Sequence, residues 1–337
     1  MASFVYLRPR MTTAMVVTLL LAAARGGDSN LFHFQVIPVV VVSPCRAIAL
    51  SAARRLDMND LEMELALNNV GSGGMGYISG AAIKGPVGHA TMTAYTISAG
   101  QTGVQIGTTT TDGSGNFNLQ IASYTGPVLL QMSGGSYTDE ATGAAMAMAA
   151  GDVLTAVVPS VAAGTTVSGV QVTPLTAMAQ TMAQHMTGGL TDANIVAANT
   201  AIGNNFSVGD ILHVQPMNPL VAGSGVGASQ DAQNYGMTLA AMSQSAQTLG
   251  LSSSSSMVTA MMNDASDGVL DGKSGTSPIS MAIGGMMGTS SLAASAGSSS
   301  LASAMSSFMG SVQNVSGLTA ANMTTLMQKL VNSSGQI

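Results

Sequence analysis

The chain has 337 residues, of which 7% are charged and 46% are hydrophobic, and its net charge is −6. This length accommodates two domains, and the hydrophobic content is too high for a disordered chain. After Gly76 the cations are Lys84, Lys273 and Lys329, against ten Asp and Glu residues. Binding to nucleic acid needs clustered Lys and Arg side chains for the phosphates, so the composition excludes this class of function.

The first 25 residues have the pattern of an export signal. An uncharged apolar run at residues 11–24 follows Arg8 and Arg10, and its length suits a signal peptide better than a membrane span. Three alanines at its end provide a cleavage site before Arg25. In the alternative reading, the run stays uncleaved as an N-terminal anchor, which would be the protein's contact with a membrane. We expect a location in the periplasm, on the cell surface or outside the cell.

Residues 26–75 differ in composition from the rest of the chain beyond residue 76. They contain a charged patch at residues 54–64, which predicts one short amphipathic helix, and they end in a Gly-rich stretch at residues 71–76. We interpret this segment as a linker or as a wrongly assigned start of the coding sequence. Cys45, the one cysteine, excludes an intrachain disulfide. It follows an apolar run, as in bacterial lipoproteins, but Pro44 departs from that pattern.

Residues 76–160 predict an antiparallel β-sandwich. Short alternating segments rich in Val, Ile, Thr and Tyr are separated by Gly, Pro, Asn and Asp. Asp112 and Gly113 have the residue types of a tight hairpin between two of these strands. The expected strands cover residues 76–83, 90–97, 108–111, 116–121, 126–132 and 153–158.

Three blocks of this region resemble the carboxypeptidase-regulatory-like, or transthyretin-like, seven-stranded sandwich. They are Ile78-Ser-Gly, Lys84-Gly-Pro-Val-Gly-His-Ala-Thr-Met-Thr-Ala-Tyr, and Thr110-Thr-Asp-Gly-Ser-Gly-Asn-Phe-Asn-Leu. A longer stretch, to about residue 279, is similar to uncharacterised bacterial exported proteins and lipoproteins in which such a sandwich precedes a helical domain. The resemblance implies location and architecture, and it implies no chemistry.

Residues 172–337 predict an α-helical domain, which makes the whole chain α+β. Thr173 followed by Pro174 is a typical helix start. Thr191 is expected to cap a second helix. Further helices are expected at residues 230–249, 257–264, 301–312 and 318–331, and the Ser-rich tract at 252–256 is expected to link or cap two of them.

Two sets of side chains in this region are candidate metal ligands. Met178, Met182 and Met186 recur every four residues, next to His185, and soft thioether and imidazole ligands favour Cu(I). In the alternative reading these methionines fill the core. Asp264, Asp267 and Asp271 stand among Gly turns, and closely spaced carboxylates favour Ca²⁺. The segment lacks the closing Glu of an EF-hand, and its alternative is an Asp/Gly-rich turn between helices.

The sequence contains no recognisable catalytic motif: no G-x-S-x-G nucleophile elbow occurs, and the histidines after residue 33 have no metal-ligand spacing. We therefore expect a non-catalytic exported protein that binds a protein or glycan partner, with exposed sheet edges as one route to binding. The second hypothesis is a metal-binding envelope protein that uses Ca²⁺ at the three aspartates or copper at the methionines and His185. The third is a hydrolase whose helical domain holds an unrecognised site.

Overall fold

The computed structural model describes residues 42–43, 46–47, 74–282 and 289–337. The chain divides into two compact units, Met1–Glu64 and Leu65–Ile337. In the first unit, β1 (Val42–Ser43) and β2 (Arg46–Ala47) form an antiparallel pair. The predicted export signal, Cys45 and the predicted helix at residues 54–64 lie outside the described residues.

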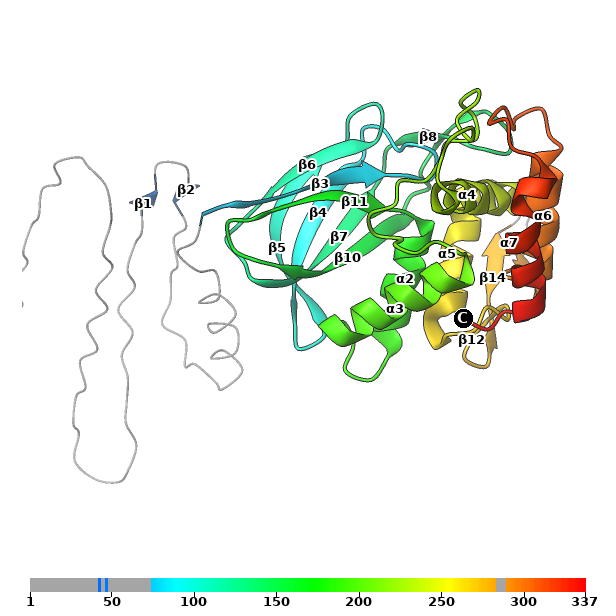
Figure 1. The fold of residues 1–337 in the computed structure, drawn as a ribbon. Coiled ribbons are helices and arrows are strands. Elements are labelled where there is room, and N and C mark those ends of the chain that lie inside the picture. The colour runs from blue at the N-terminus through cyan, green and yellow to red at the C-terminus, as the bar shows by residue number, and fades with distance from the viewer. Residues whose placement is uncertain (1–41, 44–45, 48–73, 283–288) are drawn as a thin grey trace, which may run out of the picture. The chain divides into compact units, whose positions relative to one another are not determined.

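The second unit begins with strands and continues with helices, which confirms the α+β prediction at that level (Figure 1). The strands run to Val172, beyond the expected end of the β region at residue 160. They are β3 (Gly76–Ala82), β4 (Thr91–Ser98), β5 (Gln101–Thr110), β6 (Asn116–Ile121), β7 (Gly126–Ser133), β8 (Ser136–Thr138), β9 (Ala145–Ala147), β10 (Val153–Val161) and β11 (Thr166–Val172).

The helices of this unit agree closely with the sequence expectations. They are α2 (Pro174–His185), α3 (Asp192–Asn205), α4 (Gln230–Thr248), α5 (Ser254–Asp264) with the short 3₁₀ helix η1 (Ala265–Asp267), α6 (Ser299–Met309) and α7 (Ala320–Ser333). Between η1 and α6 lie the short strands β12 (Lys273–Ser274), β13 (Ser277–Pro278), β14 (Ser280–Ala282) and β15 (Thr289–Ser291). Thr173 and Thr176 form a capping box at the start of α2, and Thr191 caps α3, as predicted.

Seven of the strands form two sheets. One has the order β10-β7-β4-β5 and the other the order β11-β3-β6. Neighbouring strands are antiparallel except β11 and β3, which are parallel. The prediction of a hairpin at Asp112 and Gly113 is wrong, because β5 and β6 belong to different sheets. The hydroxyl of Thr111, just before this turn, donates a hydrogen bond to the carbonyl oxygen of Val87 and accepts one from the backbone N–H of Ala90. The turn carries the chain from the four-stranded sheet to the three-stranded sheet.

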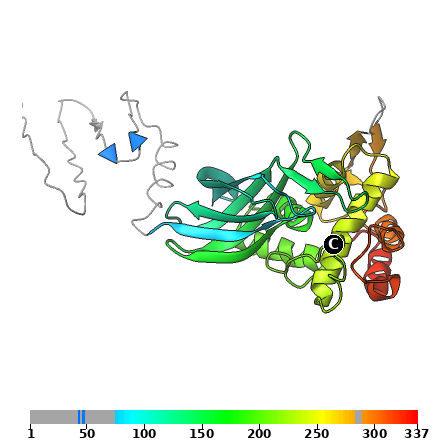
Figure 2. The same cartoon turned by 90° about the horizontal axis from the view of Figure 1, so that it is seen from above.

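Both sheets direct apolar side chains into one core. In β6, for example, Phe117, Leu119 and Ile121 are buried, while the alternate residues are exposed. The same core continues into the helices through residues such as Leu175 of α2 and Tyr235 of α4. Helix α2 packs against β10, and α4 to α7 lie beyond one end of the sheets (Figures 1 and 2). The strands and helices are therefore joined by continuous apolar packing.

Candidate functional site

The structure buries a lysine where the strands meet the helices. Lys84 lies in a tight turn directly after β3, in which Ile83 and Pro86 form a β-bridge. Gly85 has a φ of +64°, and a Cβ atom at this position would lie 2.4 Å from the carbonyl oxygen of Thr138. A residue with a side chain would therefore disrupt the turn. The turn directs Lys84 inward, where none of its surface is exposed.

The partner of Lys84 is Glu140, the one Glu after residue 64. Glu140 lies after β8, in a turn that Asp139 closes by accepting hydrogen bonds from the backbone N–H and the hydroxyl of Thr142. This turn points Glu140 into the molecule, and its Oε2 lies 2.8 Å from Lys84 Nζ. The two side chains are 0% and 3% exposed, so water screens their attraction very little.

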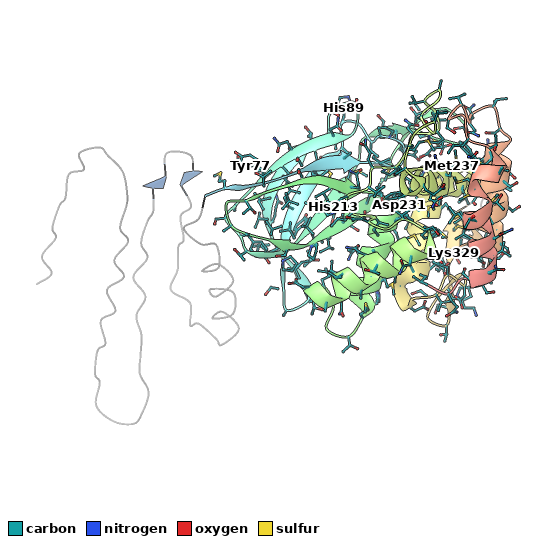
Figure 3. All side chains as sticks on the ribbon, in the orientation of Figure 1. Tyr77, His89, His213, Asp231, Met237 and Lys329 are labelled. Carbon is teal, nitrogen blue, oxygen red and sulfur yellow. The ribbon has the colours of Figure 1, made fainter. Side chains whose placement is uncertain are left out.

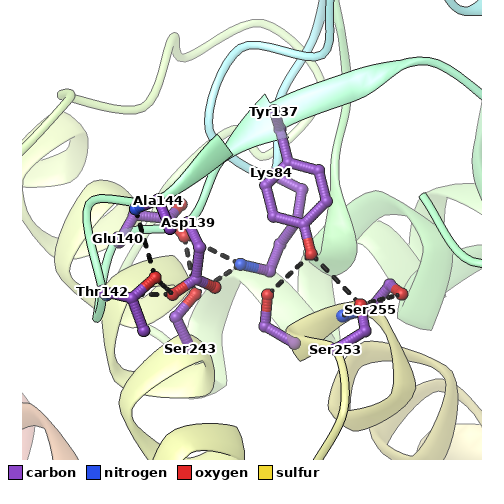
Figure 4. A network of polar contacts seen from close by, with 10 residues as sticks. Lys84, Tyr137, Asp139, Glu140, Thr142, Ala144, Ser243, Ser253 and Ser255 are labelled. Carbon is purple, nitrogen blue, oxygen red and sulfur yellow. Dashed lines mark hydrogen bonds and ion pairs between the residues drawn. The ribbon is translucent and has the colours of Figure 1, made fainter. Parts of the chain in front are cut away.

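Ser243 of α4 completes the group (Figure 4). Its hydroxyl accepts a hydrogen bond from Lys84 Nζ and donates one to Glu140 Oε2 at 2.6 Å. Three side chains from two turns and a helix therefore form a closed triangle of polar contacts. We call Lys84, Glu140 and Ser243 the buried triad.

Tyr137 of β8 borders the triad and extends it to α5. The centre of its ring lies 5.3 Å from Lys84 Nζ, which is within range of a cation–π interaction. Its hydroxyl bonds to Ser254 Oγ at 2.9 Å and to Ser253 Oγ at 3.3 Å. Ser253 is the N-cap of α5, and residues 254–256 of the Ser-rich tract already belong to the helix instead of linking to it. The hydroxyls of Ser253 and Ser254 therefore connect the start of α5 to the strand region.

One member of the triad, Glu140, borders a small pocket. The pocket has a volume of about 60 Å³, enough for a few waters at most. Glu140 and Gly85 line one side of it, and the Pro-rich segment at residues 215–219 lines the other. Lys84 and Ser243 do not line it. Glu140 is therefore the member of the triad that this pocket reaches.

The predicted calcium ligands lie at the end of α5 and in the loop after it. Asp264 is fully buried, and its Oδ1 accepts hydrogen bonds from the backbone N–H groups of Gly272 (2.7 Å) and Lys273 (3.1 Å). Asp267 accepts hydrogen bonds from backbone N–H groups through both oxygens, and Asp271 accepts one from Lys273. Each of the three carboxylates thus binds the backbone of its own loop.

One oxygen in this loop has no partner. Asp264 Oδ2 is buried and makes no hydrogen bond. Burial raises the pKa of Asp264 from 3.8 to about 6, although hydrogen bonds from the backbone N–H groups of Gly272 and Lys273 act in the opposite direction. Among the residues that the structure describes, no three His, Cys, Asp or Glu side chains are grouped as metal ligands would be.

The predicted copper ligands differ in their surroundings. Met178 is fully buried in the core, Met182 and Met186 are partly buried against it, and His185 is exposed. The Nδ1 atom of His185 lies 2.8 Å from the carbonyl oxygen of Thr181, one turn earlier in α2. The other described histidines, His89 and His213, lie at separate places on the molecule (Figure 3).

Sequence reasoning does not single out the buried triad. From the sequence, Lys84 belongs to an expected turn and Glu140 to a longer resemblance, and neither is a candidate site residue. A signal is present, because charges are so few that a Lys directly after an apolar strand and a solitary Glu are both unusual. Several Asp and Glu residues lie far from Lys84 in the sequence, and the packing of β8 and α4 decides which of them contacts it. Short-range sequence patterns contain no information on this packing.

Comparisons with known proteins add little to these observations. No protein-family model matches the chain. No curated protein matches it in sequence. A crystal structure of a 9R-lipoxygenase from Cyanothece PCC8801 is similar over 61% of this chain and 28% of that chain, with 9% identity and a TM-score of 0.19. A likeness at this level carries no conclusion about fold or activity. In the part of the chain that the structure describes, no helix has the length and apolar character of a membrane span.

Proposed function

We propose that this protein is an exported, non-catalytic protein of the cell envelope or the extracellular space that binds a partner through its β region. The N-terminal sequence pattern supports export. The two sheets, with four and three strands around a shared core, support a transthyretin-like sandwich as the fold of this region. In this proposal the sandwich presents the binding surface and the helical region is fixed to it by the buried triad.

The observation that carries the proposal is the edge strand β5. It is the last strand of the four-stranded sheet, and its first five residues, 101–105, are all exposed. From Ile106 onward the strand approaches β6, where the Ile106 carbonyl oxygen accepts a hydrogen bond from Ala122. Edge strands are commonly protected from pairing with other chains by charged residues such as Lys, or by Pro. Strand β5 contains no charged residue and no Pro.

An exposed strand edge of this kind suits a partner that adds an extended segment to the sheet. Main-chain hydrogen bonds then supply affinity, and alternate side chains supply specificity. The exposed side chains of residues 101–105 are Gln, Thr and Val, which are uncharged. We therefore favour a protein partner with an uncharged, extended segment over a glycan.

The test compares two lysine substitutions at valines of similar exposure. Val104 in β5 is 46% exposed and Val196 in α3 is 52% exposed. A partner captured from envelope extracts is identified and purified, and its affinity is then measured for the parent protein and for each variant. We expect Val104→Lys to weaken binding at least about tenfold, because a charge on an edge opposes strand addition, while Val196→Lys leaves it unchanged.

An affinity of Val104→Lys equal to that of the parent protein would refute binding through β5. If the captured partner is a glycan, the proposal of a protein partner is wrong. The broader proposal of an exported binding protein still holds in that case. If both variants weaken binding equally, the helical region shares the surface. Circular dichroism of each variant shows that a loss of binding is not a loss of folding.

Metal binding is the second candidate function, and the unpartnered Asp264 Oδ2 is the observation in its favour. A buried carboxylate oxygen without a hydrogen bond is costly, and a cation could satisfy it. A thermal melt of the full chain with EDTA or Ca²⁺ tests this, because a ligand of the folded state raises its stability. A calcium-dependent rise that disappears in Asp264→Asn would support a calcium site. An anaerobic melt with Cu(I), compared with Met182→Leu, tests the copper alternative.

A further inference from the structure

The buried triad places an amine and a carboxyl group in direct contact, with Lys84 Nζ 2.8 Å from Glu140 Oε2. Both side chains are almost wholly enclosed by protein. The backbone turns that hold them are tightly fixed, one by Gly85 and the other by Asp139. Two groups held in contact in this way react with a high effective concentration, since little orientational freedom remains to be lost.

Condensation of the two groups requires a neutral amine and a neutral carboxylic acid. Transfer of one proton from Lys84 to Glu140 across their 2.8 Å contact supplies both forms at once. These are the forms in which an amine can attack a carboxyl carbon. The ring of Tyr137 covers the amine and helps to exclude water.

Ser243 is placed to move a proton between the two groups. Its oxygen accepts a hydrogen bond from Lys84 Nζ and donates one to Glu140 Oε2. A hydroxyl in this position can take the proton that the attacking nitrogen loses and deliver one to the departing oxygen. Ser243 is thus a proton relay in the geometry of the triad.

From this arrangement we propose that Lys84 and Glu140 condense to form an intramolecular isopeptide bond. Lys84 Nζ attacks Glu140 Cδ, a nitrogen–carbon bond forms, and one carbon–oxygen bond of the carboxyl group breaks. The oxygen leaves as water with the proton from nitrogen and the proton of the acid. The step needs no oxidant, reductant or further reactant, and the small pocket that Glu140 lines offers the released water a place outside the triad.

The bond would join positions 56 residues apart, the turn after β3 and the turn after β8. It would replace a buried ion pair with an uncharged amide, which removes the desolvation cost of both charges. It would also restrict the unfolded chain, as a disulfide does. Cys45 is the one cysteine, so the chain has no intrachain disulfide for this purpose. An exported protein would gain a covalent brace that reducing agents do not cleave.

Trypsin gives a direct test on the full chain, because Lys84 is the one trypsin site between Arg55 and Lys273. The folded protein is incubated, denatured, digested and examined by mass spectrometry. An amide-linked lysine is not cleaved, so we expect one peptide covering residues 56–273 whose mass is lower by one water, about 18 Da. Digestion of that peptide with pepsin should give a branched fragment that contains both residues.

Two variants sharpen the result. Lys84→Arg keeps a positive charge but does not condense, so cleavage at this position should return and show that the site is accessible to trypsin. Ser243→Ala removes the proton relay, and its linked fraction should rise at least about tenfold more slowly during incubation of the folded protein. A purely structural role of Ser243 would change the stability and leave that rate, measured on the folded fraction, unchanged.

A branched peptide at any fraction supports the bond. Complete cleavage after Lys84 in the parent protein, with peptides of unmodified mass, would overturn the proposal. This outcome depends on the parent protein alone, so failure of a variant to fold does not weaken it. It is also separate from partner binding through β5, which the isopeptide bond does not require.

Discussion

Asp264 accepts a hydrogen bond from the backbone N–H of Gly272 at 2.7 Å and so ties the end of α5 to the loop after it. The other oxygen of the same carboxyl group is buried without a partner. One side chain therefore both organises the loop and carries an unfavourable buried charge.

This relationship predicts how stability depends on pH. Burial raises the pKa of Asp264 from 3.8 to about 6, so the folded state holds the proton more tightly than the unfolded state. Its stabilising contribution is complete below about pH 4 and is lost as pH rises through about 6. We expect the free energy of unfolding of the parent, relative to Asp264→Asn, to fall by about 2–3 kcal/mol between pH 4 and pH 7. Urea melts at several pH values measure this difference, and a constant difference would contradict the prediction.

Lys84→Met should destabilise the protein strongly, because it leaves Glu140 buried without a partner. Removal of one member of a buried pair costs about 3–5 kcal/mol. The double variant Lys84→Met/Glu140→Met removes both charges and should be about 2 kcal/mol or more stable than Lys84→Met, and neither of these variants can form the isopeptide bond. Denaturant melts of the two variants measure their free energies of unfolding. A double variant less stable than the single one would mean that packing around the triad, and not charge, dominates.

Gly80 in β3 should tolerate no side chain. A Cβ atom there would lie 1.8 Å from the carbonyl oxygen of Val170 in the parallel neighbour β11, so the strands would have to separate. We expect Gly80→Ala to lower the free energy of unfolding by about 3 kcal/mol or more. Gly113→Ala is the matched control, because a Cβ atom at Gly113 meets nothing within 4 Å. Its effect should stay within about 0.5 kcal/mol in the same melts.

The N-caps of α2 and α3 offer a comparison between a buried and an exposed threonine. Thr173 is fully buried and bonds to Thr176 in a capping box, whereas Thr191 is exposed and accepts a hydrogen bond from Asn194. Thr191→Ala should cost about 1 kcal/mol, which is typical of a lost cap. Thr173→Ala should cost about 2 kcal/mol or more, because it also leaves buried polar groups unpaired. Equal losses in thermal melts would show that burial adds nothing to the cap.

The local elements are predictable from the sequence where short-range chemistry determines them. The start of α2 at Thr173 and Pro174 and the cap of α3 at Thr191 agree with the sequence predictions, and so do β3, β4, β6, β7 and β10. The strand expected at residues 108–111 is only the end of the longer β5. Strands β8, β9 and β11 are absent from those predictions. Strand β11 is half exposed and contains Gly169, so its alternation is weak. Asp112 does lie in a turn, but residues adjacent in sequence do not reveal whether a turn joins two strands of one sheet or two different sheets.

For the predicted metal ligands, too, the sequence shows the spacing of the residues but not their surroundings in the fold. The spacing of Asp264, Asp267 and Asp271 is visible in the sequence, but the backbone N–H groups that they bind are not. The methionine pattern of α2 is equally clear, yet it does not reveal that Met178 faces the core while His185 faces solvent. Whether these residues bind metal stays a prediction for the thermal melts with Ca²⁺ and Cu(I).

The sequence by itself determined most of the helices, five strands of the two sheets, the starts of α2 and α3, and that charges are rare after residue 76. Each of these properties depends on residues within a few positions of one another. Only the tertiary structure decided that Lys84, Glu140 and Ser243 meet. Glu140 and Ser243 lie 56 and 159 residues from the lysine, and the three come together only when the sheets and α4 share one core. Chain connectivity does not constrain such distant contacts, and the packing of the apolar faces does.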